Sequence, residues 1–318
     1  MHDFAYVGIG LVILLLAGDS LVRGAVNLAL RLGIPALIVS LTVVAFGTSA
    51  PELLISVSAI LDDAPGIALG NVVGSNTANI LLVLGIPAMI AAMHMAGAET
   101  RKNYLMMLAA TVLFIGLCFF GPLTWWHGLI MLAALALILA DQLRDALTHR
   151  RAGKKAEAEV EVEVEGADPS MRGYKIALFL AVGLVGLPLG ADMLVQGATG
   201  IARDYGVSET VIGLTLVAVG TSLPELATTV MAAFRKQADV AMGNVIGSNM
   251  FNLLAIIGIS TLIGPIPVTD QFLTFDLWVM LGASLLLMPF VIGHWTMGRA
   301  WGAIFAALYG GYVLLTVW

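Results

Sequence analysis

A seven-residue block recurs at a fixed distance in this chain, and each copy lies inside an apolar segment. Gly47-Thr-Ser-Ala-Pro-Glu-Leu53 returns 173 residues later as Gly220-Thr-Ser-Leu-Pro-Glu-Leu226. A second block follows at the same spacing, as Gly70-Asn-Val-Val-Gly-Ser-Asn76 and as Gly243-Asn-Val-Ile-Gly-Ser-Asn249. Aligned without a gap from the first glycine of each copy, the two stretches are identical at 18 of 39 positions. Repetition of this density indicates duplication, so the chain must fold into two related halves.

Long apolar runs place both halves in a lipid bilayer. The chain is 59% hydrophobic and only 11% charged, with a mean hydropathy of +0.97, whereas a soluble domain has about 25% charged residues. A helix needs roughly 20 apolar residues to cross a bilayer, and runs of that length recur. We therefore predict an all-α integral membrane protein with ten transmembrane helices. They lie at about 4–30, 36–60, 66–93, 103–120, 124–141, 174–200, 208–233, 239–263, 272–292 and 297–317.

The repeat divides the chain into two five-helix halves joined by a charged linker. An odd number of crossings per half turns the second half upside down, which gives inverted-topology repeats with a binding site expected near the midplane. Asp19 and Asp192 correspond at the same offset, and we interpret them as local polar packing or as a gate. The predicted parts are a first half at 1–143 with its repeat at 39–85, a linker at 144–172, and a second half at 173–318 with its repeat at 212–258.

The basic residues predict the orientation. If the N-terminus is outside, 14 of the 15 Lys and Arg residues fall in or beside cytoplasmic loops, and only Arg203 lies outside. The positive-inside rule therefore favours both termini outside and the linker in the cytoplasm. The glutamate-rich part of the linker is expected to be a solvated tether, which we favour over a strand or a regulatory cation site.

Each first block should break its helix. Pro51 and Pro224 have no N–H, and each proline ring clashes with the carbonyl four residues back. Backbone carbonyls around 47–49 and 220–222 should then be free, which is tolerated at membrane depth only where they line a cavity or bind something. The Thr-Ser pair before each proline and the glutamate after it add hydroxyl and carboxylate oxygens.

The second block adds oxygens on one helix face. Ser75 and Asn79 are four residues apart, as are Ser248 and Asn252. A set of oxygen ligands with no histidine or thiolate suits hard cations such as sodium, calcium or magnesium, and flexible coordination favours calcium over magnesium. Close helix approach is expected at the four glycines of these blocks, Gly70, Gly74, Gly243 and Gly247.

Two glutamates, Glu52 and Glu225, occupy equivalent intramembrane positions, where an ionisable residue is a functional candidate by default. One calcium ion neutralises two carboxylates, whereas three sodium ions leave one net positive charge. A single cavity could thus hold either load but not both, which is the requirement for exchange. Moving one net charge couples transport to voltage at about 2.3 kcal/mol per 100 mV.

At these motifs the chain resembles the cation/calcium exchanger superfamily, and most closely its compact prokaryotic sodium/calcium exchangers. The resemblance implies that Glu52 and Glu225 bind calcium together with the carbonyls of Thr48 and Thr221. In this family, alternating access is attributed to sliding of the first and sixth helices. The resemblance also implies sodium sites built from Ala45, Thr48, Ser49, Ser75 and Glu52 and from Ala218, Thr221, Ser222, Ser248 and Glu225, with Asn79 and Asn252 lining the middle.

One position departs from the family pattern. Several exchangers, including the potassium-dependent branch, carry an aspartate where this chain has Asn252. Because Asn79 occupies the matching position, the site has two carboxylates and not three. The missing acid weakens the case for potassium cotransport and leaves the coupling ion open.

The leading hypothesis is a sodium-driven calcium antiporter that extrudes calcium electrogenically from a prokaryotic cell. We expect a monomer in the plasma (inner) membrane, with calcium, sodium and lipid as its partners, without a cofactor, nucleic acid or enzymatic activity. A proton-coupled or potassium-dependent exchanger is the alternative within transport, and a cation channel is the alternative outside it. An intramembrane hydrolase is disfavoured, because Ser49 and Ser222 lack an activating histidine or lysine at membrane depth.

Overall fold

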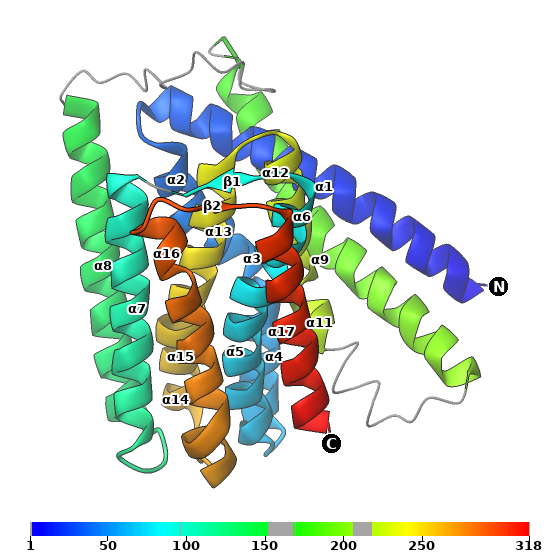
Figure 1. Cartoon of the computed structure of the whole chain (residues 1–318), viewed down its shortest axis with the longest axis vertical. Coiled ribbons are helices and arrows are strands. Elements are labelled where there is room, and N and C mark those ends of the chain that lie inside the picture. Colours follow the sequence, from blue (N-terminus) through cyan, green and yellow to red (C-terminus); the bar gives the residue numbers. More distant parts are fainter. Residues whose placement is uncertain (1, 96, 152–167, 169, 206–217, 318) are drawn as a thin grey trace.

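A computed structural model describes residues 2–95, 97–151, 168, 170–205 and 218–317. Within these residues the chain is helical apart from one short pair of strands (Figure 1). Most of the predicted linker at 144–172 lies outside the described residues, as does the first part of the predicted span at 208–233.

The first half consists of eight α-helices, two π-helical segments and one strand within the described residues. They are α1 (His2–Leu32), α2 (Ala36–Val39), η1 (Ser40–Val44), α3 (Ala45–Thr48), α4 (Ala50–Leu61), α5 (Pro65–Ala78), η2 (Asn79–Val83), α6 (Gly85–Ile90), β1 (Met93–His94), α7 (Ala98–Cys118) and α8 (Trp125–Arg151).

The second half repeats the two helices around the first block and the helix, π-helix and helix that follow them, but its strand lies before its last helix. It consists of α9 (Gly173–Asp204), α11 (Ala218–Thr221), α12 (Leu223–Phe234), α13 (Ala238–Met250), η4 (Phe251–Ile256), α14 (Ile257–Ile263), η5 (Phe272–Asp276), α15 (Leu277–Leu286), α16 (Met288–Val291), β2 (Thr296–Met297) and α17 (Arg299–Val317).

All ten predicted spans overlap helices wherever the chain is described. Seven helices of the described part are long and apolar enough to cross a membrane, or eight if the bent pair formed by 36–48 and 50–61 counts as one span. Leu223–Phe234 is a shorter apolar helix by the same measure. The described part of the chain is therefore predominantly helical, with helices long and apolar enough to cross a membrane, and the count of ten remains a prediction.

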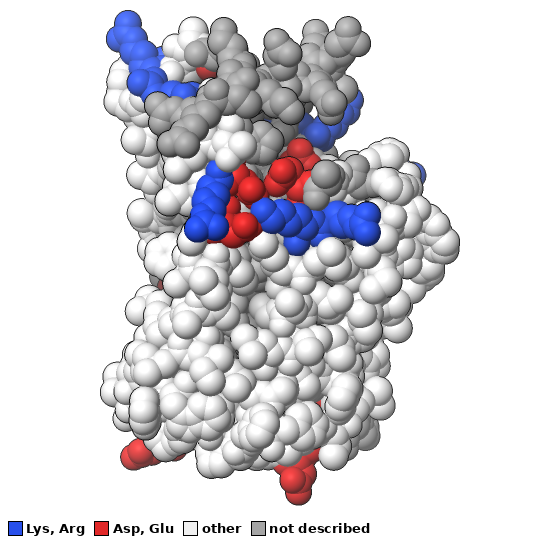
Figure 2. Space-filling view, turned by 90° about the vertical axis from the view of Figure 1, so that its left-hand side faces the viewer, with Lys and Arg blue, Asp and Glu red and all other residues white. Residues whose placement is uncertain are grey.

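The outer surface of the molecule suits lipid. Large apolar side chains such as Leu16, Leu54 and Leu137 are more than half exposed. The face seen in Figure 2 carries a broad uncharged band, with Lys and Arg gathered toward one end and only acidic side chains at the opposite end. An apolar surface of this extent indicates contact with a membrane.

The longest two helices pack on each other. In Figure 1, α1 and α9 lie side by side and tilt away from the upright bundle formed by the remaining helices. Glycines make this close approach possible: a Cβ on Gly183 would lie 2.5 Å from the Cβ of Leu21, and one on Gly190 would lie 2.9 Å from the backbone nitrogen of Leu14. The pair is thus held by close backbone contact.

The core of the bundle contains α5 and α13, which are mostly buried. A Cβ on Gly243 would lie 2.7 Å from the carbonyl oxygen of Leu37, and one on Gly247 would collide with that of Leu41. The predicted close approach is confirmed at these two glycines. At Gly74 a Cβ would meet no described atom within 4 Å, so that position shows no such packing against the described residues.

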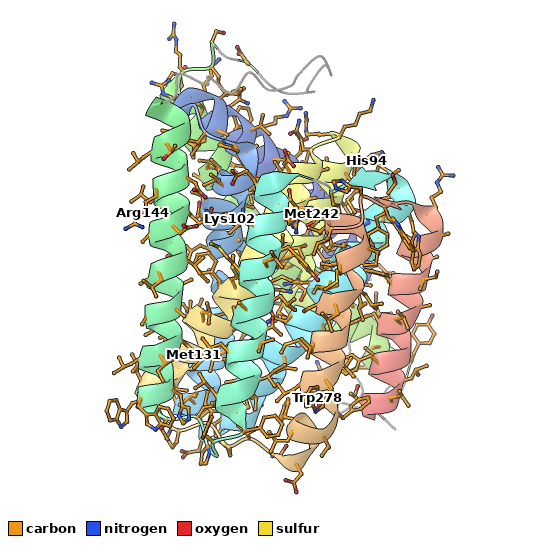
Figure 3. All side chains as sticks on the ribbon, turned by 60° about the vertical axis from the view of Figure 1, so that its left-hand side comes forward. His94, Lys102, Met131, Arg144, Met242 and Trp278 are labelled. Carbon is orange, nitrogen blue, oxygen red and sulfur yellow. The ribbon has the colours of Figure 1, made fainter. Side chains whose placement is uncertain are left out.

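Two features were not anticipated from the sequence. Met93–His94, after α6, pairs antiparallel with Thr296–Met297, before α17, so a short strand pair connects the two halves in an otherwise helical fold. In addition, α8 continues to Arg151, past the predicted span end at 141. Its extension is braced by Lys102 of α7, which reaches toward α8 and forms ion pairs with Asp141 and Asp145 (Figure 3).

Candidate functional site

Both first blocks break their helices at the serine before the proline. Ser49 separates α3 from α4 with φ −84° and ψ 3°, and Ser222 separates α11 from α12 with φ −88° and ψ 3°. In the first half the helices on either side are bent by 41°. Each proline lies within the first two positions of the new helix, where the N–H has no intrahelical partner in any case. The missing N–H therefore ends the first helix without weakening the second. The predicted interruption is confirmed in both halves.

The breaks place one glutamate in the first turn of each new helix. Glu52 is the third residue of α4, Glu225 is the third residue of α12, and both side chains are 0% exposed. The unpaired N–H groups at a helix N-terminus carry partial positive charge, which favours an anionic side chain there. Ser49, three residues before Glu52 in the first half, donates from its hydroxyl to Oε1 of Glu225 at 3.4 Å. The structure therefore brings the two acids into one buried site.

The backbone oxygens differ in part from the prediction. The carbonyl of Ser49 accepts the N–H of Leu53 at 3.2 Å, and the carbonyl of Ser222 accepts the N–H of Leu226 at 3.0 Å. These two carbonyls are thus satisfied within their helices, and the expectation that they are free is wrong. The new helix starts early enough for its first regular hydrogen bond to reach them, whereas Pro51 and Pro224 cannot serve the carbonyls of Gly47 and Gly220.

Hydroxyl groups from both halves surround the acid of the second half. Ser248 donates to Oε1 of Glu225 at 3.4 Å and lies 3.4 Å from the hydroxyl of Thr48. The hydroxyl of Thr48 also approaches the carbonyl of Ala45 at 3.3 Å and Oδ1 of Asn244 at 3.2 Å. These contacts share the hydroxyl proton of Thr48 between oxygens of the two halves.

Several oxygens at the site are buried without a partner on another residue. Both carboxylate oxygens of Glu52 and Oε2 of Glu225 belong to this group, together with the hydroxyl of Ser222. The amide oxygens of Asn79 and Asn252 are likewise unpartnered, and so is the amide nitrogen of Asn252. Buried polar atoms are nearly always paired, because an unpaired one costs free energy. Such a concentration of unsatisfied oxygens is what a cation site requires.

A crossed pair of asparagines links α5 and α13 at the centre. Asn76 donates to the carbonyl of Asn249 at 3.4 Å, and Asn249 donates back to the carbonyl of Asn76 at 3.3 Å. Asn79 then donates to Oδ1 of Asn249 at 3.0 Å. Asn79 opens η2 and Asn252 lies in η4, and π-helical turns of this kind are frequent at functional sites.

All predicted site residues that are described lie in the broken helices or in the helices facing them. Ala45, Thr48 and Ser49 belong to α3 and its end, and Thr221 and Ser222 to α11 and its end. Ser75, Asn79, Ser248 and Asn252 are buried on α5, η2, α13 and η4. Ala218 begins α11, but its side chain lies outside the described part. In the described residues, no group of three or more His, Cys, Asp or Glu could hold a metal ion.

Two acids outside this site differ in their surroundings. Asp19 of α1 pairs with Arg23 at 3.0 Å, and its Oδ1 accepts from Nε of Arg235 at 2.5 Å. The corresponding Asp192 of α9 is exposed and accepts a hydrogen bond from Gln196 at 2.7 Å. The polar-packing interpretation thus describes Asp19, which ties α1 to the end of α12.

Comparison with known proteins identifies the family. The family model described as sodium/calcium exchanger protein matches residues 2–143 and 175–318. The chain belongs to the sodium/calcium exchanger family. It is 32% identical over 342 residues to sodium/calcium exchanger MaX1 of Methanosarcina acetivorans, covering 98% of each chain. It is also 33% identical over 313 residues to inner membrane protein YrbG of Escherichia coli, covering 96% of this chain and 93% of YrbG.

The fold comparison agrees with this membership. The solved structure of the sodium-calcium exchanger NCX_Mj soaked with 10 mM Na+ and zero Ca2+ superposes with a TM-score of 0.81 at 32% identity, and the match covers 98% of each chain. This exchanger-family chain is therefore an integral membrane antiporter of the cation/calcium exchange type, and it is not an enzyme.

Proposed function

We propose that this protein exchanges sodium for calcium by alternating access at the buried site formed where its two broken helices meet. The single observation that carries the proposal is the matched pair of fully buried glutamates, Glu52 and Glu225, each in the first turn of an interrupted helix. Three of their four carboxylate oxygens have no partner on another residue. A cation that takes these oxygens as ligands removes both the unsatisfied hydrogen-bonding capacity and the repulsion between the charges.

The ligand sets follow the two halves. Calcium is bound by the carboxylates of Glu52 and Glu225 and the backbone carbonyls of Thr48 and Thr221. The sodium ligands are Ala45, Thr48, Ser49, Ser75 and Glu52 in one set and Ala218, Thr221, Ser222, Ser248 and Glu225 in the other, with Asn79 and Asn252 in the middle.

The charge on the site makes exchange electrogenic. One calcium ion neutralises the two carboxylates, whereas three sodium ions leave one net positive charge. An inside-negative potential then favours sodium entry and calcium extrusion, at about 2.3 kcal/mol per 100 mV for each net charge. Asn79 and Asn252 add no charge, so the balance depends on the two glutamates alone.

The membrane arrangement completes the proposal. Ten spans form two inverted five-helix halves, at 1–143 and 173–318, in the inner membrane of a prokaryote. Both termini lie outside and the linker at 144–172 lies in the cytoplasm, which is supported by the segregation of basic side chains toward one end in Figure 2. The protein functions as a monomer, because each chain supplies both halves of the site. The α1–α9 pair slides across the bundle, which its close mutual packing supports.

The test is radiolabelled calcium uptake into proteoliposomes that contain the purified protein. Vesicles are loaded in turn with sodium, with potassium, or with buffer that supports only a pH gradient. We expect calcium uptake only when sodium can leave the vesicles down its gradient. The rate of uptake should rise when a potassium–valinomycin potential makes the vesicle interior positive. Uptake that persists with a pH gradient and no sodium would identify a proton-coupled exchanger. Uptake that needs no counter-ion would identify a channel, and both results contradict the proposal.

A further inference from the structure

One asparagine in each half contacts the backbone of the residue that carries the carboxylate. The side-chain nitrogen of Asn71, on α5, donates to the carbonyl of Glu52 at 3.3 Å and to the hydroxyl of Ser56 at 3.1 Å. The side-chain nitrogen of Asn244, on α13, donates to the carbonyl of Glu225 at 3.3 Å and to a second hydroxyl at 3.2 Å. The same three-part contact is therefore built twice, at positions related by the repeat.

The contact in the second half is closed into a triangle. Its second hydroxyl belongs to Thr229, which itself donates to the carbonyl of Glu225 at 2.7 Å. Both Asn244 and Thr229 are fully buried, so neither can exchange this partner for water. The first turn of α12 follows a helix break and lacks the preceding turn that would normally hold it. Asn244, on the neighbouring α13, adds a restraint on the carbonyl side of this turn.

The helix that carries this restraint also carries the hydroxyl that meets the carboxylate. Asn244 and Ser248 are four residues apart on α13 and therefore share a face, as do Asn71 and Ser75 on α5. Ser248 donates to Oε1 of Glu225 at 3.4 Å. Fixing the backbone of the glutamate against this face thus sets the separation between its carboxylate and the serine one turn further on.

Asn244 also connects the two halves. Its Oδ1 faces the hydroxyl of Thr48, at 3.2 Å, while its nitrogen serves Glu225 and Thr229. Thr48 is the last residue before the break in the first half. One amide therefore fixes the end of α3 relative to the start of α12. Neither Asn71 nor Asn244 is a member of the proposed ion-ligand sets.

We propose that Asn71 and Asn244 are positioning residues that hold Glu52 and Glu225 in the geometry needed to share a cation. The inference rests on the proposed function for the identity of the cation, but the positioning itself does not depend on which ion is carried. Groups that orient metal ligands without touching the metal typically contribute about 10–100-fold to affinity. We expect losses in this range, with a larger loss at Asn244 because it also holds Thr48.

The test compares Asn71→Ala and Asn244→Ala with a matched control, Asn103→Ala. Asn103 is 0% exposed, as is Asn244, and it accepts a hydrogen bond from Gln142 of α8, outside the site. The first measurement is the infrared carboxyl band of Glu225 in purified, ion-free protein, assigned by its loss in Glu225→Gln. We expect this band to shift or broaden in Asn244→Ala and to stay unchanged in Asn103→Ala, because only the first change moves the carboxylate relative to Ser248.

The second measurement is the affinity for calcium and for sodium, from the rise in melting temperature with added ion. We expect about a 10–100-fold loss in Asn71→Ala and Asn244→Ala and less than a 2-fold change in Asn103→Ala. Thr229→Val is a milder variant in case Asn244→Ala does not fold. Because Thr229 and Asn244 hold the same carbonyl, the effects of the two substitutions should be less than additive when combined.

The outcomes separate this inference from the proposed function. An unchanged Glu225 band in Asn244→Ala, an equal change in Asn103→Ala, or additive effects with Thr229→Val would overturn the positioning role. A wild-type protein that neither calcium nor sodium stabilises would contradict the proposed function instead. In that case the infrared comparison still decides whether the asparagines position the carboxylates, since it requires no bound ion.

Discussion

Replacing Glu52 by glutamine should separate the stability of this protein from its affinity for cations. Both carboxylate oxygens of Glu52 are buried without a partner on another residue, and Ser49, three residues earlier, donates to Glu225. Glutamine has nearly the same shape and removes one buried charge together with its repulsion. The ion-free variant should therefore melt at the wild-type temperature or above it, whereas stabilisation by calcium should nearly disappear.

The size of the effect follows from the loss of one of two charges. A unit-charge pair at 4 Å is worth about 4 kcal/mol at an effective dielectric constant near 20, so a divalent ion should lose at least about 100-fold in affinity. At 100 times the wild-type Kd, ligand stabilises the wild-type protein by about 2.7 kcal/mol and the variant by only about 0.4 kcal/mol. At roughly 2–4 °C per kcal/mol, the calcium-induced rise in melting temperature should shrink by about 5–9 °C.

Thermal unfolding in detergent, with and without calcium, measures both quantities on one sample. Glu225→Gln should behave in the same way, because an amide oxygen can still accept the hydrogen bonds from Ser49 and Ser248. Glu99→Gln is the control, since Glu99 lies at the start of α7, outside the site. If either site variant keeps the wild-type calcium shift, or if ion-free Glu52→Gln is markedly less stable, the assignment of these glutamates is wrong.

Three further changes test other parts of the structure. Asn252→Asp adds a third acid to the site, so vesicle calcium flux should become more dependent on pH or monovalent cation, and an unchanged profile would argue against a middle-site role. Gly247→Ala should lower the unfolding free energy by roughly 1–3 kcal/mol in denaturation experiments, since a Cβ there collides with backbone, whereas Gly282→Ala, with open space among the described atoms, should not. Arg235→Gln should cost roughly 1–3 kcal/mol by removing a charged partner from Asp19, and a loss unaffected by adding Asp19→Asn would contradict this pairing.

Much of the site's framework could be predicted because local chemistry determines it. Proline without an N–H must end one helix and can begin another, so the breaks before Pro51 and Pro224 follow from the sequence alone. The duplication then requires that whatever follows one break also follows the other. The pairing of two buried acids was therefore predictable from composition and spacing, without knowledge of any distance.

The contacts that orient the site could not be predicted in the same way. Asn71, Asn76, Asn244 and Asn249 stand in the second block in both copies, but only the glycines and serines of that block carried a predicted role. Their roles depend on which helix they face, and that is set by tertiary packing. The sequence did contain one indication of these roles, because asparagine occurs at the matched positions of both copies. Helix packing alone would accept many small or apolar residues there. The prediction that the carbonyl of Ser49 is free was wrong for a related reason. Whether this carbonyl accepts the N–H of Leu53 depends on where the new helix starts.

The duplication also bears on where the two halves of the structure differ. Two inverted halves of identical conformation would be equally open or equally closed to the two sides, so a state that opens to one side only has to break the symmetry. The described contacts do so at the centre, where Asn79 donates to Asn249 while both amide atoms of Asn252 remain unpartnered. They do so again at the ends, where Asp19 meets Arg235. Residues that are identical in the two repeats thus predict the composition of the ion site. Contacts that occur in only one half arise where the repeats differ in sequence or in conformation.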